Sequence, residues 1–314
     1  MPLSPETRSL LDMAYRVGAP RFHELSPAQA RHSFHKLQFA FRPEAPAVAA
    51  VAEVPIPRRD GSALLSRLYR PLSSHHDDVL PLLIFHHGGG WCVGDVPSYD
   101  VLCRELANGS GCAVLSVEYR LAPEHPFPAA IEDARLAFDW CADNAALLGI
   151  DAVRIALGGD SAGGNLAIVT ALALRDEDRQ PAFLMLVYPS TEIISTRPSR
   201  TLYSAGYFLD RETLQWFFER YLPEGNTEDW RASPMRAGSL AGLPPMLLIA
   251  AEFDPLVDDC AAFAQRVAQE GGVVDYQLVE GVVHGFFTLG KAIPEAGRAV
   301  ALAAAALRRA LRGE

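Results

Sequence analysis

The sequence predicts an α/β fold in which helices cover both faces of a doubly wound, mostly parallel sheet of about eight strands. Short, mainly apolar runs such as 80–85 and 113–117 are typical of strands that are buried on both faces. Helix-forming segments alternate with such runs through the second half of the chain, which favours parallel pairing. In addition, the run 155–157 enters a helix at 166–174 through a tight, glycine-rich turn.

The bulk properties are those of a globular protein. The chain has 314 residues, of which 49% are hydrophobic and 21% charged, so it can form one large α/β domain or two small ones. The net charge of −10 argues against a broad nucleic-acid-binding surface. No run approaches the length of a membrane span, and the first residues lack the apolar core of a signal peptide. We therefore expect a soluble cytoplasmic protein that binds no nucleic acid.

The first 47 residues are predicted to form a helical segment without strands. Apolar residues at 10–17 recur with the period of a helix. A second helix is predicted to start with Ser26 as N-cap, Pro27 in the first turn and Gln29 closing a capping box. The many aromatic side chains of this segment need a partner surface, so we interpret residues 1–47 as part of a helical cap.

From residue 48 the apolar pattern changes to that of strands. The first two strands, 51–56 and 64–69, flank a turn at 59–62. The later strands alternate with helices and are therefore expected to pair in parallel. Strands are predicted at 80–85, 113–117, 155–157, 183–188, 246–251 and 273–279, and helices at 98–107, 129–148, 166–174, 256–269 and 295–311.

A long segment between the strands at 183–188 and 246–251 interrupts the alternation. It contains an N-cap candidate, Asp210, followed by apolar residues at helical spacing. We interpret residues 190–235 as a helical insertion over the carboxyl edge of the sheet, where open α/β sheets bind ligands. The apolar residues that define its helix are Leu214, Phe217, Phe218 and Tyr221.

The turn after the strand at 155–157 has the pattern G-x-S-x-G, with Ser161 at its centre. A strand that reverses into a helix within a few residues brings two backbones close together, so only glycine fits at 159 and 163. The turn holds the serine in a strained conformation with its hydroxyl exposed above a helix N-terminus. Ser161 is therefore the candidate nucleophile.

A serine nucleophile needs a base, and in this type of sheet the chain order is serine, then acid, then histidine. Of the nine histidines, only His284 lies beyond Ser161, and it follows the last predicted strand. Asp254 is the favoured acid because it lies in a loop before a proline that keeps it extended, and Asp258 is its main rival. The acids that follow the preceding strand are Glu252, Asp254, Asp258 and Asp259.

Three successive glycines, 88–90, follow the buried strand at 80–85. Their backbone N–H groups, with that of Ala162, can stabilise the oxyanion of an acyl-transfer reaction. A phosphate-binding loop is less favoured, because no lysine follows the glycines. No metal site is expected, since His86 and His87 have no third ligand at a suitable spacing and the five cysteines form no C-x-x-C pair.

Five ordered motifs together resemble those of the hormone-sensitive lipase family, most closely its bacterial carboxylesterases with an aspartate beside the nucleophile. They span about residues 80–290, roughly two-thirds of the chain. The resemblance implies an α/β-hydrolase fold with an eight-stranded, mostly parallel sheet, a catalytic domain at 48–314, a helical cap and no cofactor. The motifs are His87-Gly88-Gly89-Gly90-Trp91, the block 119–129, Gly159-Asp160-Ser161-Ala162-Gly163-Gly164-Asn165, Asp254-Pro255-Leu256-Val257-Asp258 and His284-Gly285-Phe286.

The resemblance also implies a role for each site residue and an activity. It makes the protein a carboxylic ester hydrolase that works through an acyl-enzyme on a small-molecule ester. A covered pocket of limited depth favours short to medium acyl chains. An amidase, a lactonase or a deacetylase with the same triad, and a non-catalytic receptor on this fold, are the alternatives, and a homodimer stays open. The implied roles are nucleophile for Ser161, acid for Asp254, base for His284, oxyanion donors for Gly89, Gly90 and Ala162, and support of the glycine loop for His87 and Gly88.

Overall fold

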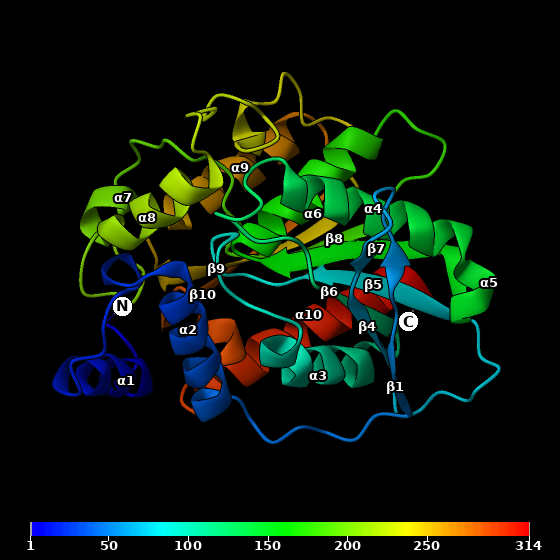
Figure 1. Ribbon diagram of the computed structural model, residues 1–314, viewed down its shortest axis with the longest axis horizontal. Helices are drawn as coiled ribbons and strands as arrows, with labels where there is room; N and C mark the ends of the chain where they lie inside the picture. The colour runs from blue at the N-terminus through cyan, green and yellow to red at the C-terminus, as the bar shows by residue number, and fades with distance from the viewer. Residues whose placement is uncertain (1, 314) are drawn as a thin grey trace.

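A computed structural model describes residues 2–313 and contains an eight-stranded sheet between two layers of helices (Figure 1). The strand order is β1-β4-β6-β5-β7-β8-β9-β10. All neighbours from β6 to β10 pair in parallel, whereas β4 is antiparallel to both β1 and β6. The strands are β1 Ala50–Glu53, β4 Ser66–Arg70, β5 Leu80–His86, β6 Ala113–Val117, β7 Ile150–Asp160, β8 Phe183–Val187, β9 Met246–Phe253 and β10 Val274–Val283. The eight-stranded, mostly parallel sheet is confirmed.

The helices form two layers and an additional group at the carboxyl edge of the sheet. One core cluster lies between the sheet and α4, α6 and α9, and a second lies between the opposite face and α3 and α10. The additional helices belong to the N-terminal segment and to the insertion between β8 and β9. The helices are α1 Pro5–Arg16, α2 Pro27–Phe41, α3 Asp100–Ser110, α4 Ala129–Asp143, α5 Ala145–Leu148, α6 Ala162–Leu174, α7 Ser199–Leu202, α8 Arg211–Tyr221, α9 Val257–Gln269 and α10 Pro294–Arg312.

The central strands are buried on both faces. Every residue of β5, β6 and β8 is buried, which explains why their sequences are continuous apolar runs and do not alternate with polar residues. Because parallel strands end at the same edge of a sheet, the residues that follow β7, β9 and β10 are brought together there.

The predicted pair of strands at 51–56 and 64–69 is divided in the structure. Its outer parts, β1 and β4, pair in the main sheet, whereas its inner parts form a separate two-stranded sheet, β2 (Ile56–Pro57) with β3 (Ala63–Leu64). The break falls at Pro55, which has no N–H to donate to a ladder, and at Leu65, whose side chain is exposed.

Two further boundaries differ from the prediction. The predicted helix 129–148 is divided into α4 and α5, because Asn144 leaves the helical region with φ −110° and ψ 25°. Its side-chain amide donates to the carbonyl of Trp140, so the asparagine ends the first helix. The strand predicted at 155–157 is longer, since β7 begins at Ile150.

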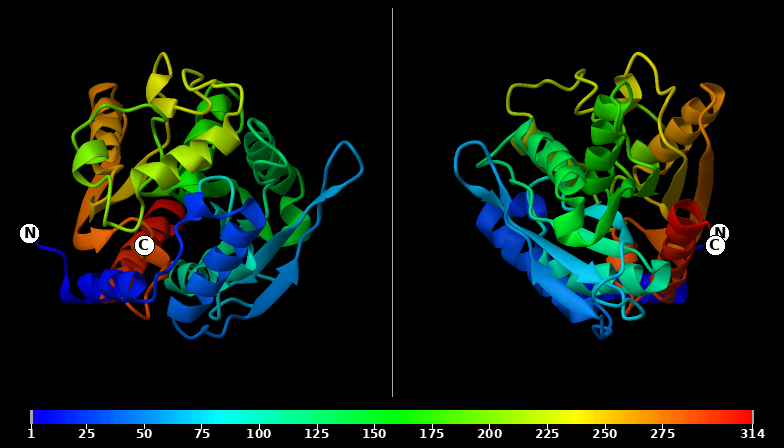
Figure 2. Two further views of the ribbon diagram at one scale, coloured as in Figure 1. Left: turned by 60° about the vertical axis from the view of Figure 1, so that its left-hand side comes forward. Right: turned by 90° about the vertical axis from the view of Figure 1, so that its right-hand side faces the viewer.

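The part of the N-terminal segment around Phe22 packs against α8 of the insertion, whereas α1 contacts β10 (Figure 2). The capping box of α2 is present, with a hydrogen bond of 3.0 Å from the Ser26 N–H to the Gln29 side chain. The Phe22 ring lies 5.9 Å from that of Phe217 on α8. Arg21 forms an ion pair of 3.0 Å with Asp210, the N-cap of α8. The two segments are therefore joined by both apolar and charged contacts.

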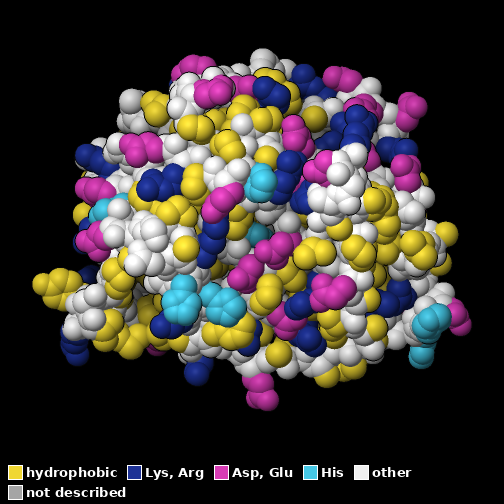
Figure 3. All heavy atoms as spheres, in the orientation of Figure 1, with side chains coloured by type: hydrophobic (Ala, Val, Ile, Leu, Met, Phe, Trp, Pro, Cys, Tyr) yellow, Lys and Arg dark blue, Asp and Glu magenta, His cyan; other side chains and the backbone are white. Residues whose placement is uncertain are grey.

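Acidic and basic side chains are interspersed on the face shown in Figure 3. The net charge of −10 is thus not gathered into one patch on this face. Within residues 2–313, no helix combines the length and the apolar character that crossing a bilayer requires. In the same part of the chain, no three His, Cys, Asp or Glu side chains are grouped as a metal site requires.

The turn from β7 into α6 crosses the end of β5 with no space for side chains. A Cβ atom added at Gly163 would overlap the carbonyl of His86, and one added at Gly159 would overlap the same carbonyl. Both obstacles are backbone atoms of a buried strand and cannot be moved by a change of rotamer. The glycines of the predicted turn are therefore required by close approach of the backbone.

We expect the same substitution to have opposite effects at two helical glycines. Gly163→Ala should lower the free energy of unfolding by ~3 kcal/mol, because its methyl group would push β5 away from α6. Gly297→Ala on α10 should raise it by ~0.5–1 kcal/mol, since that glycine has no atom within 4 Å of an added Cβ. Urea unfolding of both variants tests this, and equal effects would contradict it.

Candidate active site

Three residues predicted to act together meet at the carboxyl edge of the sheet. Ser161 follows β7, Asp254 follows β9 and His284 follows β10. His284 Nε2 lies 2.9 Å from the Ser161 hydroxyl, and His284 Nδ1 lies 2.7 Å from an Asp254 oxygen. With the proton on Nδ1, the imidazole donates to the carboxylate and accepts from the serine. Asp254 is fully buried and His284 is 8% exposed, so the triad is largely shielded from water.

Ser161 has the strained backbone that the turn predicts, with φ 54° and ψ −116°. A positive φ is uncommon for a residue with a side chain and persists only when the surrounding structure enforces it. Two backbone hydrogen bonds enforce it here, from the Ser161 N–H to Val187 at 2.9 Å and from the Ser190 N–H to the Ser161 carbonyl at 3.1 Å. The hydroxyl is held toward His284 as a result.

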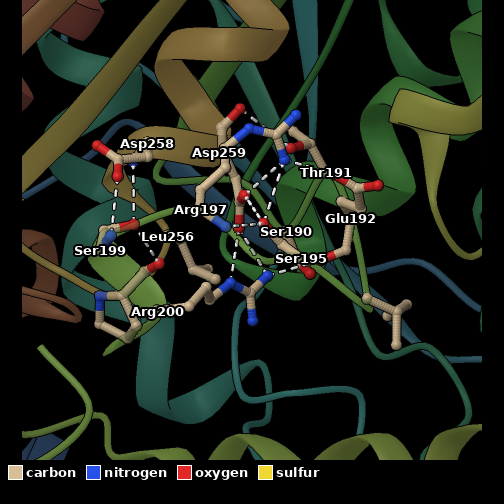
Figure 4. A network of polar contacts seen from close by, with 12 residues as sticks. Ser190, Thr191, Glu192, Ser195, Arg197, Ser199, Arg200, Leu256, Asp258 and Asp259 are labelled. Carbon is tan, nitrogen blue, oxygen red and sulfur yellow. Dashed lines mark hydrogen bonds and ion pairs between the residues drawn. The ribbon is translucent and has the colours of Figure 1, made fainter. Parts of the chain in front are cut away.

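The four candidate acids occupy different positions. Asp254 reaches His284 with one oxygen and accepts the Leu256 N–H at 2.8 Å with the other. Asp258 accepts the Ser199 N–H at 2.8 Å, and Asp259 lies between Arg197 and Arg200 (Figure 4). Glu252 accepts the Gly281 N–H at 2.7 Å. The geometry therefore pairs the histidine with the favoured acid, whereas the main rival lies on α9 and contacts the insertion.

The glycine loop, residues 88–90, borders the hollow that contains Ser161. Gly89 and Gly90 have φ 116° and 56°, which glycine adopts readily and other residues rarely do. Both line the same hollow as Ser161 and His284. A Cβ at Gly90 would overlap the ring of Phe217, so the insertion is in direct contact with the loop. Ala162 is buried at the first turn of α6, whose N-terminus begins beside the serine.

His87 holds the glycine loop through a hydrogen bond and a ring contact. Its ring stacks on Tyr119 at 4.3 Å, and its Nδ1 donates to the Gly88 carbonyl at 2.7 Å. Complete burial lowers the pKa of His87 to about 4, so the ring is neutral at physiological pH. A neutral imidazole can hold the carbonyl without placing a positive charge next to the nucleophile.

Asp160 has a position that reasoning from the sequence did not find. Its carboxylate is buried and accepts the Gly88 N–H at 2.7 Å and the Tyr99 hydroxyl at 3.0 Å. Burial raises the pKa of Asp160 to about 6, although both hydrogen bonds act in the opposite direction. The aspartate thus fastens the glycine loop to the serine turn. Its partners lie 72 and 61 residues earlier, so the motif alone could not identify them.

A hollow of about 770 Å³, partly open to solvent, extends from the triad. Its wall is mainly apolar, and the N-terminal segment, the glycine loop, the insertion and the segment after β10 contribute most of it. Such a wall is suited to a hydrocarbon chain and limits the access of water to Ser161. The residues contributed by the N-terminal segment are Phe22, Phe34 and Gln38, and those from the insertion are Ser190, Phe208, Leu209, Thr213, Leu214, Phe217 and Phe218.

Known proteins with similar sequences are esterases. The family model for the α/β-hydrolase fold matches residues 83–288. The ethyl acetate hydrolase of Pseudomonas putida is 36% identical over 292 residues, which cover 92% of each chain. Carboxylesterase NlhH of Mycobacterium tuberculosis is 40% identical over 239 residues, which cover 74% of this chain and 75% of the relative.

The fold is also that of a solved enzyme. The crystal structure of a Ser-to-Ala variant of an α/β-hydrolase enzyme from the metagenome of Lake Arreo, Spain, superimposes with a TM-score of 0.93. It is 42% identical to this chain, and the match covers 98% of both chains. These similarities confirm the resemblance predicted from the five motifs. The chain belongs to the hormone-sensitive lipase family of the α/β-hydrolase superfamily.

Proposed function

We propose that this enzyme, a carboxylic ester hydrolase, uses Ser161 as nucleophile, His284 as general base and Asp254 as the acid that orients the histidine. The observation that best supports the assignment is the chain of two hydrogen bonds, 2.9 Å from Ser161 to His284 and 2.7 Å from His284 to Asp254. A triad of this order activates the serine without a cofactor. The intact triad also argues against a non-catalytic receptor.

In the proposed mechanism, Ser161 Oγ attacks the ester carbonyl carbon while His284 Nε2 takes the hydroxyl proton. Asp254 stabilises the imidazolium that forms. The tetrahedral oxyanion accepts hydrogen bonds from the N–H groups of Gly89, Gly90 and Ala162. The bond to the alcohol then breaks, and the alcohol leaves with the proton from His284. Water attacks the acyl-enzyme by the same route, which releases the carboxylic acid and restores the serine.

We assign the N-terminal residues 1–47 and the insertion 190–235 to a cap over the catalytic domain at 48–314. The contacts between Phe22 and Phe217, and between Arg21 and Asp210, support a cap made of both segments. Its side chains cover part of the hollow and narrow the space beside the triad, which favours short to medium acyl chains. The name of the Pseudomonas putida relative, an ethyl acetate hydrolase, agrees with a small ester substrate.

We also place the enzyme in the cytoplasm. All five cysteines are buried and free in the structure, which is the usual state in a reducing compartment. The enzyme would therefore encounter its small-molecule ester substrate inside the cell.

Ser161→Ala and His284→Ala should each lower kcat/KM for a simple ester by about 10⁴-fold or more, because the triad acts as a unit. The double variant should be little worse than either single one. Circular dichroism and thermal unfolding serve as controls for folding. Near wild-type turnover by either single variant would refute the assignment.

Asp254→Asn should lower kcat far more than Asp258→Asn. An asparagine at 254 favours the wrong tautomer of His284, a loss of about 10⁴-fold in the serine-protease example. Asp258 instead accepts a backbone N–H, which an asparagine carbonyl can also do. Steady-state kinetics of this matched pair tests the choice, and the reverse ranking would transfer the role to Asp258.

Asp160→Asn should lower activity without lowering stability at neutral pH. The pKa of Asp160 in the folded protein, about 6, exceeds its ordinary value of 3.8, so folding favours the protonated acid. The protonated acid therefore stabilises the folded state at low pH, and this contribution to stability is lost as the pH rises through 6. The stability of the variant relative to wild type should therefore be higher at pH 7.5 than at pH 4.

Urea unfolding at the two pH values checks this sign, with Asp176→Asn on the exposed surface as the control. We expect at least a tenfold loss of kcat/KM for Asp160→Asn, because the negative charge beside the forming imidazolium is removed. An unchanged rate, or a relative stability that does not depend on pH, would contradict the role of Asp160.

A further inference from the structure

One polar side chain in the apolar wall of the hollow has no assigned function. Gln38 lies in the last turns of α2 and is 3% exposed. Its Oε1 atom is buried and has no hydrogen-bond partner within the described residues. The same side chain lines the hollow that contains Ser161 and His284. Buried amide oxygens nearly always have a partner, so an unpaired one on a side chain that lines the hollow points to a ligand.

Gln38 belongs to the part of the wall that α2 contributes. It follows Phe34 by one helical turn, and both side chains line the hollow. The Phe34 ring stacks on Tyr99 at 6.4 Å, and the Tyr99 hydroxyl binds Asp160, the residue before Ser161. Gln38 therefore belongs to the wall that packs against the catalytic loops.

The groups next to Gln38 do not provide a hydrogen-bond donor for its side-chain oxygen. Leu289, Phe34 and the Tyr99 ring line the same hollow, and none of them donates a hydrogen bond to Oε1. The hydroxyl of Thr288 lies 3.3 Å from the Gly285 carbonyl. The helix does not need the side chain either, because the Gln38 backbone carbonyl accepts the Arg42 N–H at 2.9 Å independently of it.

We propose that Gln38 determines specificity by accepting a hydrogen bond from a hydroxyl or amide N–H group on the substrate chain. The enzyme would then prefer esters whose acyl or alcohol chain carries such a donor over wholly apolar esters of the same length. The proposal rests on the proposed function, since Ser161 must attack the same bound ester. It adds a chemical class to the substrate: a hydroxylated or amide-bearing ester of moderate length.

The preference follows from the cost of covering an unpaired oxygen. An apolar chain that reaches Gln38 leaves Oε1 buried without a donor, whereas a hydroxyl at that point pairs with it. A site that is built to bind a hydroxyl discriminates against the analogue that lacks it, because its own polar group is then unsatisfied. One net hydrogen bond corresponds to about a fivefold to tenfold difference in kcat/KM.

The test uses matched pairs of esters over a series of chain lengths. Alkyl acetates are compared with their ω-hydroxyalkyl acetates, and ethyl alkanoates with ethyl ω-hydroxyalkanoates, so that the acyl and alcohol sides are probed separately. The measured quantity is the ratio of kcat/KM for the hydroxylated ester to that for its apolar partner. Wild type is compared with Gln38→Met, which keeps the length of the side chain and removes both polar atoms.

Gln215→Met is the matched control, because it makes the same chemical change at an exposed glutamine on α8. At one or more chain lengths, we expect wild type and Gln215→Met to show the higher ratio and Gln38→Met to lower it about fivefold to tenfold. Thermal unfolding gives a second readout. Removal of an unpaired buried oxygen should leave the melting temperature of Gln38→Met unchanged or raised, whereas a structural role for Gln38 predicts a fall.

The proposal is overturned if the ratio differs by less than about twofold between wild type and Gln38→Met at every chain length on both sides of the ester. It is also overturned if wild type shows no preference for any hydroxylated ester. Ser161→Ala is assayed in parallel on the simple esters. Activity that survives in Ser161→Ala refutes the proposed function itself, whereas a loss of activity there with an unchanged ratio in Gln38→Met refutes only the role of Gln38.

Discussion

The site depends on one buried carboxylate that joins two loops from distant parts of the chain. Asp160 ends β7 directly before Ser161, and its oxygens accept hydrogen bonds from the Gly88 N–H and the Tyr99 hydroxyl. Burial alone would favour a neutral acid, and the two donors offset part of that cost. The glycine loop therefore has a fixed position relative to Ser161. The proposed oxyanion donors in this loop need to be in place before the charge develops, and the contact supplies that constraint.

Much of the fold and of the triad could be predicted because each part leaves a local signal. The glycines around Ser161 are demanded by the crossing of two backbones, and strands that are buried on both faces have continuous apolar sequences. His284 could be found because it is the one histidine that follows the nucleophile in the chain. These signals do not depend on knowing which distant residues touch.

The rest depends on contacts between distant segments, which a single sequence does not contain. Asp254 and Asp258 have the same chemistry and lie four positions apart, and the structure separates them because Asp254 bonds to His284 whereas Asp258 accepts the Ser199 N–H. The partners of Asp160 are similarly distant in the chain. Gln38 is an ordinary helical glutamine until the fold places it in an apolar wall without a partner. The break between α4 and α5 at Asn144 could not be predicted, because helix propensity is a weak guide to where a helix ends.

Ion pairs hold the insertion against α9, the helix that follows Asp254. Asp259 is fully buried between Arg197 and Arg200, in the first turn of α9 and five residues after Asp254 (Figure 4). Buried ion pairs contribute little net stability, because desolvation offsets their attraction. Their geometry is nevertheless restrictive, since breaking one leaves a buried charge without a partner. The wall of the pocket and Asp254 consequently keep a fixed relation: the insertion cannot move away from α9 without exposing or orphaning Asp259.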